Sequence, residues 1–374
     1  MYNSCNNMNS TSLYLKYRPF QLDDVVGHKH IVATLRRASE QNLFAHAYLF
    51  SGNRGCGKTT SARIAANLMT CENIQNGKLC GKCRACTTIH NGSSLDVREL
   101  DGAKNGKVEH IQELIDGAQW PPQELKRKVY IIDEAHQLTD KAISALLKIV
   151  EEPPPYLTFI FCTTEIKKIL PTILSRCQRF NFNKISSKDI VERLSYIASN
   201  EHISIEPGAL LLLSKLSRGS MRDAISYLEQ IGTVAAGKNI TEKASHQYFG
   251  SVDQSGILNI IKSIFNGNVS LLLDQINDLV ITSADPKEIM FYISEMLRNI
   301  MLIKVQGDKS ALLDLSDNEI SELSKIGEMV KLSQLLKMSS FFADIEKKIE
   351  FNINDRWVME TTLINCIASL RKES

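Results

Sequence analysis

Short apolar runs alternate with amphipathic stretches through the first half of the chain. Five runs rich in β-branched and aromatic residues have the length and bounds of buried strands: residues 47–51, 95–100, 129–132, 158–162 and 179–182. The stretches between them carry apolar residues at helical spacing, as Ile143, Leu146, Leu147 and Val150 do at i, i+3, i+4 and i+7. This alternation predicts an α/β domain in which helices cover both faces of a parallel sheet.

Helical periodicity replaces the strand pattern after Phe182. Ser186 and Ser187 are suited to cap the first helix, because a serine hydroxyl accepts hydrogen bonds from the unpaired N–H groups there. The apolar faces that follow are Ile190, Leu194 and Ile197; Leu210, Leu213 and Leu216; Met221, Ala224, Ile225 and Leu228; Ile257, Ile260, Ile261, Ile264 and Phe265; and Leu332, Leu335 and Leu336 with Ser339. We therefore expect a flexible leader (1–13), an α/β domain (14–185), a small helical domain (186–250) and a third, helical domain (251–374) that favours oligomerisation.

Length and composition fit a globular protein of two or three domains, with 374 residues, 43% hydrophobic and 23% charged. A formal net charge of +2 gives no overall attraction to nucleic acid, so any DNA contact has to come from local patches or from several subunits together. The sequence has no apolar stretch of 18 residues and no secretory signal, which predicts a cytoplasmic protein without a membrane partner.

Residues 52–59 fit the phosphate-binding pattern G-x-x-x-x-G-K-[ST] at every required position. The loop lies between a predicted strand and a predicted helix at 58–68, where backbone N–H groups and the helix N-terminus bind phosphate. The predicted ATP-binding residues are Gly52, Asn53, Arg54, Gly55, Cys56, Gly57, Lys58, Thr59 and Thr60. Lys58 is expected to reach the β- and γ-phosphates, and Thr59 to ligate Mg²⁺. A glycine-rich turn without a ligand is the minor alternative.

Two acids end the predicted strand at 129–132. Ligands of parallel sheets bind at the carboxyl ends of the strands, so Asp133 is placed to hold Mg²⁺. Glu134 is placed to orient or deprotonate an attacking water. Two solvated acids that cap the next helix would be the alternative, and the phosphate-binding loop upstream makes it minor.

Four of the nine cysteines form one cluster, Cys71, Cys80, Cys83 and Cys86, with the spacing C-x8-C-x2-C-x2-C. Gly77 and Gly81 supply turns between them, and four thiolates bind Zn²⁺ tetrahedrally, so a structural zinc site is predicted. A disulfide loop is disfavoured by the predicted reducing compartment, and an iron–sulfur cluster is the less favoured metal site. Cys5, Cys162, Cys177 and Cys366 are isolated and mostly expected in cores.

Cys56 stands at a variable position of the phosphate-binding loop. A thiol beside a helix N-terminus and Lys58 is a candidate for a lowered pKa and fast alkylation. A passive small residue is the equally favoured alternative.

Together these segments resemble the AAA+ ATPases and, more narrowly, the gamma/tau subunits of bacterial DNA polymerase III clamp loaders. The resemblance runs from about Tyr14 to the C-terminus. Its segments are 16–19, 24–27, 46–52, the four-cysteine insertion, 132–134, 146–148, 151–154, Ser175-Arg176-Cys177 and 219–224. The cysteine insertion and the Ser-Arg-Cys triplet are much more specific than the phosphate-binding loop.

The resemblance implies further roles for individual residues. Thr163 or, preferably, Thr164 would sense the γ-phosphate, and Val25 and Val26 would line the adenine pocket. Arg176 would be an arginine finger that acts on the ATP of a neighbouring subunit. Arg222 would sense the γ-phosphate in its own subunit and couple it to the angle between domains. From composition alone, surface salt bridges would be favoured for both arginines.

The resemblance also implies a function in DNA replication. The chain would be an ATPase subunit of a hetero-pentameric loader, with several copies of this chain, that opens the sliding clamp and loads it onto primer–template DNA. Relatives are grouped with DNA-directed DNA polymerases, yet no carboxylate pair outside the ATP site suggests nucleotidyl transfer. Relatives often carry further C-terminal domains, so either a short, gamma-like form or a truncated chain fits.

Two other functions compete with this one. A different AAA+ machine, such as a helicase loader or branch-migration motor, has no reason to carry the cysteine insertion. A non-hydrolysing scaffold would usually lose Lys58, Thr59, Asp133 or Glu134, all of which are present.

Overall fold

The computed structural model describes residues 12–250, 254–281, 285–307, 317–343 and 355–371. Contacts along the chain divide it into two compact units, Met1–Ile240 and Thr241–Ser374. The predicted leader lies outside the described residues up to position 11, as does Cys5, and Leu13 already begins α1 (Leu13–Lys16). In the part of the chain that is described, no helix combines the length and hydropathy needed to cross a bilayer.

A five-stranded parallel sheet in the order β2-β3-β4-β1-β5 forms the centre of the first unit. The strands are β1 (Ala47–Gly52), β2 (Val97–Asp101), β3 (Lys128–Asp133), β4 (Leu157–Thr163) and β5 (Gln178–Phe182). Every residue of β4 is buried, as expected for a central strand between two layers of helices. The parallel α/β prediction is confirmed, although β2 begins two residues later than predicted.

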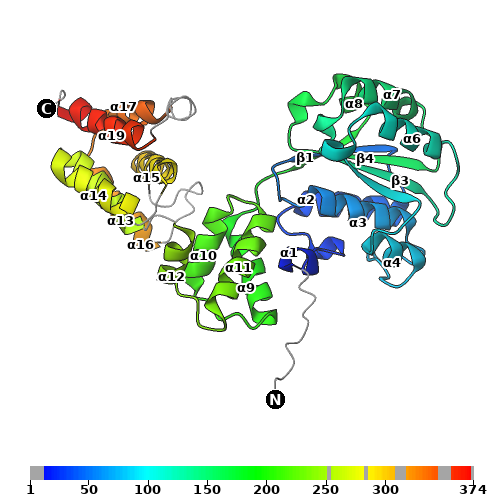
Figure 1. The fold of residues 1–374 in the computed structure, drawn as a ribbon, viewed down its shortest axis with the longest axis horizontal. Helices are drawn as coiled ribbons and strands as arrows, with labels where there is room; N and C mark the ends of the chain where they lie inside the picture. The colour runs from blue at the N-terminus through cyan, green and yellow to red at the C-terminus, as the bar shows by residue number, and fades with distance from the viewer. Residues whose placement is uncertain (1–11, 251–253, 282–284, 308–316, 344–354, 372–374) are drawn as a thin grey trace, which may run out of the picture. The chain divides into compact units, whose positions relative to one another are not determined.

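Helices cover both faces of this sheet (Figure 1). On one face, Tyr48 and Phe50 pack with α2 (Lys29–Gln41), α3 (Lys58–Thr70) and α4 (Arg84–His90). On the other, Ala47 and Leu49 pack with α6 (Val108–Ala118), α7 (Asp140–Glu151) and α8 (Pro171–Leu174). Alternate residues of one strand therefore serve two cores, as a pleated strand requires.

Short helices fill the connections of the first unit. They are η1 (Leu22–Asp24), α5 (Gly102–Asn105), η2 (Ala135–Gln137) and η3 (Ile166–Lys168). Of these, η2 and η3 come next in sequence after β3 and β4, the two strands whose ends carry predicted catalytic residues.

Three helices complete the first unit: α9 (Ser187–Asn200), α10 (Pro207–Leu216) and α11 (Met221–Ala235). The hydroxyl of Ser186 accepts from the Asp189 N–H, and that of Ser220 from the Asp223 N–H, so both α9 and α11 begin at serine caps. Ile190, Leu194 and Leu213 are fully buried between these helices, as the apolar pattern predicted.

The second unit is helical throughout its described residues. Its helices are α12 (Glu242–Phe249), α13 (Gln254–Phe265), α14 (Val269–Ile281), α15 (Pro286–Gln306), α16 (Asp317–Glu328), α17 (Leu332–Ala343) and α19 (Asp355–Arg371). The boundary between the units lies in sequence between Ile240 and Thr241, one helix before the predicted start of the third domain at residue 251. The core contains the predicted face of Ile257, Ile260, Ile261 and Ile264.

One predicted face of the second unit is partly wrong: Leu335 is buried as predicted, but Leu332 and Leu336 are exposed. Leu336 is 57% exposed, whereas Leu335, Met338 and Phe342 enter the core. Residues 335, 338 and 342 lie close to one line along a helix, and residue 336 is turned about 100° away from it. Several apolar side chains in sequence allowed two choices of face, and packing against the other helices decides between them.

A buried carboxylate holds the loop that enters β3. Asp96 is 1% exposed and accepts three backbone hydrogen bonds, from Gln123, Glu124 and Leu125, at 2.8, 2.7 and 2.9 Å. Asp96→Asn replaces one acceptor oxygen by an NH₂ group that faces N–H donors, so we predict a loss of about 2–3 kcal/mol of stability. Urea unfolding measures this loss. The exposed Asp116→Asn is the control, and equal stabilities of the two variants would contradict the prediction.

Candidate active site

The loop after β1 has a backbone that only glycine accommodates at two points. Gly52 has φ of 147°, and a Cβ there would lie 2.1 Å from the Phe182 carbonyl oxygen. Gly55 has φ of 73°, and its Cβ would lie 1.9 Å from the Ser220 hydroxyl at the start of α11. The loop is therefore pressed against β5 on one side and against the helical part of the unit on the other.

Lys58 closes the loop from within. Its side chain is buried, and its ammonium group donates to the carbonyl oxygens of Gly52 at 2.9 Å and Asn53 at 2.8 Å. Since Lys58 is also the first residue of α3, the helix N-terminus and the ammonium group bring positive charge to the same point. Such a loop is built to bind an anion.

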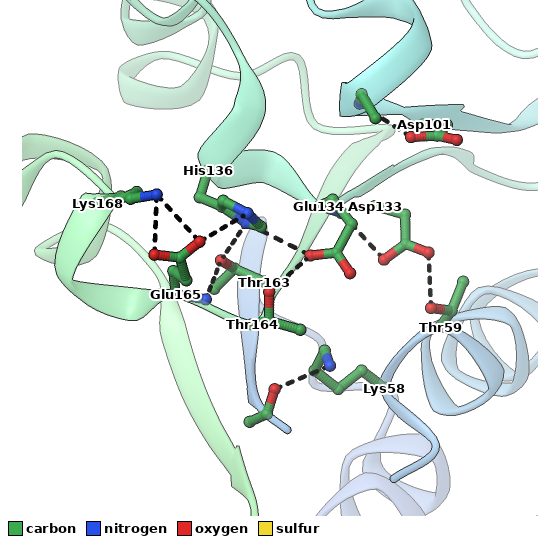
Figure 2. Close-up of polar contacts among 12 residues, drawn as sticks. Lys58, Thr59, Asp101, Asp133, Glu134, His136, Thr163, Thr164, Glu165 and Lys168 are labelled. Carbon is green, nitrogen blue, oxygen red and sulfur yellow. Dashed lines mark hydrogen bonds and ion pairs between the residues drawn. The ribbon is translucent and has the colours of Figure 1, made fainter. Parts of the chain in front are cut away.

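The acids after β3 lie beside this loop (Figure 2). Asp133 Oδ2 accepts from the Thr59 hydroxyl at 2.8 Å, and Oδ1 accepts from the Glu134 N–H at 3.0 Å. Burial raises the pKa of Asp133, while its two hydrogen bonds oppose that shift. The structure thus brings together Thr59 and Asp133, the two residues that were predicted to share a Mg²⁺ ion.

Glu134 occupies an unusual backbone position. Its φ of 47° and ψ of 47° are left-handed, a conformation that costs a non-glycine residue about 1–2 kcal/mol. The carboxylate accepts from the Thr164 hydroxyl at 3.1 Å. Thr163, the other candidate sensor, is fully buried and contacts His136 instead. Of the two threonines, Thr164 is therefore the one beside the acids.

A cavity of about 760 Å³ joins these side chains. Among the predicted residues it is lined by Val25, Val26, Asn53, Arg54, Gly55, Cys56, Gly57, Lys58, Thr59, Thr60, Asp133, Glu134, Thr164 and Arg222. Its lining also contains Tyr14, Tyr17 and Arg18 from the N-terminal segment and Arg193 from α9. These four were not predicted as site residues, because no local pattern tells that α1 and α9 face the loop after β1.

The two predicted arginines lie in different places. The Arg222 guanidinium lies over the Tyr14 ring, 4.7 Å from its centroid. The backbone N–H of Arg222 donates to the Gly55 carbonyl oxygen at 3.4 Å. Arg176 does not line the cavity. It is half-exposed and forms an ion pair with Glu151 at 2.6 Å, so its charge is presented on the surface of the unit.

The lowered pKa that was expected for the Cys56 thiol is wrong. Cys56 is buried, and its Sγ donates to the Asn53 carbonyl oxygen at 2.7 Å. Burial raises the pKa of this thiol, and the nearby Lys58 only partly offsets that effect. The alternative of a passive small residue is the one that the packing favours.

Comparison with known proteins decides the family. The subunit gamma of DNA polymerase III from Buchnera aphidicola is 37% identical over 298 residues, which are 80% of this chain and 80% of that protein. The chain belongs to the DNA polymerase III gamma/tau family. The Bacillus subtilis subunit tau is 36% identical over 96% of this chain, and the Escherichia coli subunit tau 31% identical over 94%. The chain spans 63% and 54% of the lengths of these two relatives.

Three family models divide the gamma/tau chain in the same order as its fold. They are described as "DNA polymerase III, delta subunit" for residues 27–186, "DNA polymerase III clamp loader subunit, ATPase lid domain" for 189–239, and "DNA polymerase III subunits gamma and tau domain III" for 240–373. A solved branch-migration motor of Thermotoga maritima is 19% identical over 72% of this chain and 86% of that one, with a TM-score of 0.47 that carries no weight here. Family membership places the chain among the AAA+ ATPases.

The four clustered cysteines of this gamma/tau chain surround one point. Their ligand atoms all lie within 4.8 Å of one another, and the Sγ–Sγ distances include 3.7 Å for Cys71–Cys80, 3.8 Å for Cys71–Cys83 and 3.9 Å for Cys80–Cys86. Four sulfurs at about 2.3 Å from one tetrahedral ion would be about 3.8 Å apart. The spacing therefore suits a single ion, and all described cysteines are free thiols.

The packing of Cys56 generates a prediction about alkylation. At pH 8, iodoacetamide should label Cys56 in the folded chain roughly tenfold more slowly than in urea, because burial both blocks access and raises the pKa. Since a raised pKa leaves less thiolate at this pH, labelling of the folded chain should accelerate as pH rises further. Mass spectrometry of the Cys56 peptide measures both rates, and equal rates with and without urea would refute the prediction.

Proposed function

We propose that this chain is an ATP-hydrolysing subunit of a bacterial DNA polymerase III clamp loader. The observation that carries the proposal is the 2.8 Å contact between Thr59 and Asp133, beside Glu134, in a cavity that also contains Lys58 and Thr164. These are the side chains that hydrolysis of a nucleoside triphosphate needs, collected at one edge of the sheet. Membership of the gamma/tau family supports the choice of machine.

The residues suit ATP and Mg²⁺ in the following way. The loop from Gly52 to Thr60 would hold the phosphates, and Val25 and Val26 would contact the adenine. Thr59 and Asp133 would hold Mg²⁺, since neighbouring oxygen ligands of an octahedral ion with bonds of 2.0–2.1 Å are about 2.9 Å apart. When bound, the ion would neutralise charge on the phosphate oxygens.

Hydrolysis would depend on Glu134, Thr164 and Lys58. Glu134 would accept the proton of the attacking water, which makes that water a better nucleophile. Thr164 would donate a hydrogen bond from its hydroxyl to the γ-phosphate. Lys58 would move its ammonium group from the loop carbonyls to the phosphate oxygens. Both contacts place positive charge or a donor where negative charge grows in the transition state.

The two arginines would couple this reaction to movement. Arg222 lies in the first turn of α11, where a change of its partner from Tyr14 to the γ-phosphate would pull on the helical part of the unit. Arg176 is presented on the surface and would serve the site of a neighbouring subunit. This arrangement would let ATP order a ring of subunits, because one phosphate is bound from two chains.

The proposed partners follow from the same reading. The chain would join other loader subunits through its second unit, in a hetero-pentamer with several copies of this chain, and act in the cytoplasm at the replisome. The assembled ring would bind the sliding clamp and primer–template DNA. The formal net charge of only +2 per chain suits a DNA contact that is shared among protomers.

ATP hydrolysis by the chain together with its companion subunits tests the proposal. We expect the rate to rise strongly only when the sliding clamp and primed DNA are both added. Glu134→Gln should lower the rate roughly 100-fold or more while ATP binding persists, whereas Lys58→Ala should also lose ATP binding. The exposed Glu109→Gln is the matched control and should behave as the wild type.

Either of two results would contradict the proposal. If the hydrolysis rate is the same with and without the sliding clamp, the chain would be an AAA+ ATPase with another target. A rate that is unchanged by Glu134→Gln would instead point to a scaffold, because the measured hydrolysis would then come from the companion subunits.

We also propose that Cys71, Cys80, Cys83 and Cys86 hold a structural Zn²⁺ ion, because four thiolates leave no position for a substrate. The purified chain should contain about one zinc per molecule, and Cys83→Ser should lose it and destabilise the chain. Cys162→Ser is the control, since that buried thiol lies outside the cluster. Elemental analysis measures the metal, and stoichiometric iron in place of zinc would refute the assignment.

A further inference from the structure

One buried side chain beside the predicted active site has no part in the mechanism above. His136 lies in η2, two residues after Glu134, and its side chain is only 6% exposed (Figure 2). A polar ring that is buried this far needs partners for both of its nitrogens. The partners that it has connect the turn after β3 with the end of β4.

Nδ1 of His136 faces two oxygens. It lies 3.0 Å from the Thr163 hydroxyl and 3.4 Å from Glu134 Oε2. The Thr163 hydroxyl oxygen accepts from the Glu165 N–H at 3.0 Å, so it is held in place by the backbone after β4. The carboxylate of Glu134 therefore has a nitrogen beside it that is fixed by a fully buried threonine.

Nε2 of His136 faces the opposite way. It lies 3.4 Å from Glu165 Oε1, and Glu165 is in turn bound by Lys168 at 2.9 Å. The ring thus stands between two carboxylates, Glu134 and Glu165, with one nitrogen toward each (Figure 2). Both contacts fix the plane of the ring, and the contact with Glu165 turns Nδ1 toward Glu134.

Nδ1 of His136 matters because Thr164 has only one hydroxyl proton to donate. The Thr164 hydroxyl carries one proton, and here it donates that proton to Glu134 Oε2 at 3.1 Å. In the proposed reaction the same hydroxyl donates to the γ-phosphate, and a single O–H cannot serve both acceptors fully. Glu134 then loses a partner in the step where the direction of its carboxylate matters.

We propose that His136 is the positioning residue of Glu134. When Thr164 turns to the γ-phosphate, the Nδ1–H of His136 shifts its hydrogen bond from the Thr163 hydroxyl, 3.0 Å away, to Glu134 Oε2, 3.4 Å away here, and holds the carboxylate toward the attacking water. This inference rests on the proposed ATPase function. His136 touches neither nucleotide nor water in this role, and it acts only through Glu134.

Three substitutions separate the two nitrogens of the ring. Asn carries a side-chain N–H₂ at the position of Nδ1, Gln carries one at the position of Nε2, and Leu carries none at a similar volume. We expect His136→Leu and His136→Gln to lower kcat roughly 30-fold with KM for ATP within about 2-fold, because a misplaced base fails in the transition state rather than in binding. His136→Asn should retain kcat within about 5-fold of the wild type.

A double substitution distinguishes positioning from support of the fold. In the Glu134→Gln background, His136→Leu should lower the remaining rate no further, since residues that act as a unit are not additive. Lys168→Ala is the control for the outer ion pair. It removes a partner of Glu165 on the exposed side and should leave kcat unchanged. Melting temperatures of all variants show whether each one folds.

The inference and the proposed function fail in different ways. A wild type that does not hydrolyse ATP overturns the proposed function. An active wild type with His136→Leu at the same kcat overturns the inference alone. The inference is also overturned if Gln restores activity and Asn does not, or if His136→Leu lowers the rate further when Glu134 is already Gln.

Discussion

The order of the strands is the constraint on which the rest of the site depends. In a parallel sheet all carboxyl ends lie at one edge, and the order β3-β4-β1 places three of these ends side by side. Thr59 follows β1 and its loop, Asp133 ends β3 and Thr164 follows β4, so residues as far apart in sequence as Thr59 and Asp133, 74 positions, form a hydrogen bond. A different strand order would keep every motif and lose the site.

The phosphate-binding loop is closely packed against two other parts of the first unit. Gly52 touches the β5 backbone, and Gly55 touches Ser220 at the cap of α11. The start of α11 also carries Arg222, which lies over Tyr14. Any movement of the loop on binding a phosphate would therefore displace the first turn of α11 directly, because the loop and the helix cap are in contact without a flexible linker between them. This contact would be a physical basis for the proposed coupling between nucleotide binding and the angle between domains.

Motifs made of residues close together in sequence could be predicted from the sequence alone. The phosphate-binding loop, the acids after β3 and the four cysteines are each defined within a short stretch of sequence. The residues of each motif, and the ligand expected for each, could therefore be predicted from spacing. The places of Tyr14, Arg18 and His136 at the site could not be predicted, because they depend on segments distant in sequence that fold against them. The error at Leu336 has the same origin, since the buried face of a helix rich in leucine is chosen by its neighbours. Burial also reversed the expectation for Cys56, where the apolar surroundings outweigh a nearby lysine.

Transfer of a sliding clamp to DNA tests the central claim most directly. Labelled clamp is incubated with primed circular DNA, this chain and its companion subunits, and the clamp that stays on DNA after gel filtration is measured. We expect stable clamp–DNA complexes with ATP, and few with a non-hydrolysable analogue or with the Glu134→Gln chain. Clamp that is loaded equally well with Glu134→Gln, or not loaded at all while ATP is consumed, would contradict it.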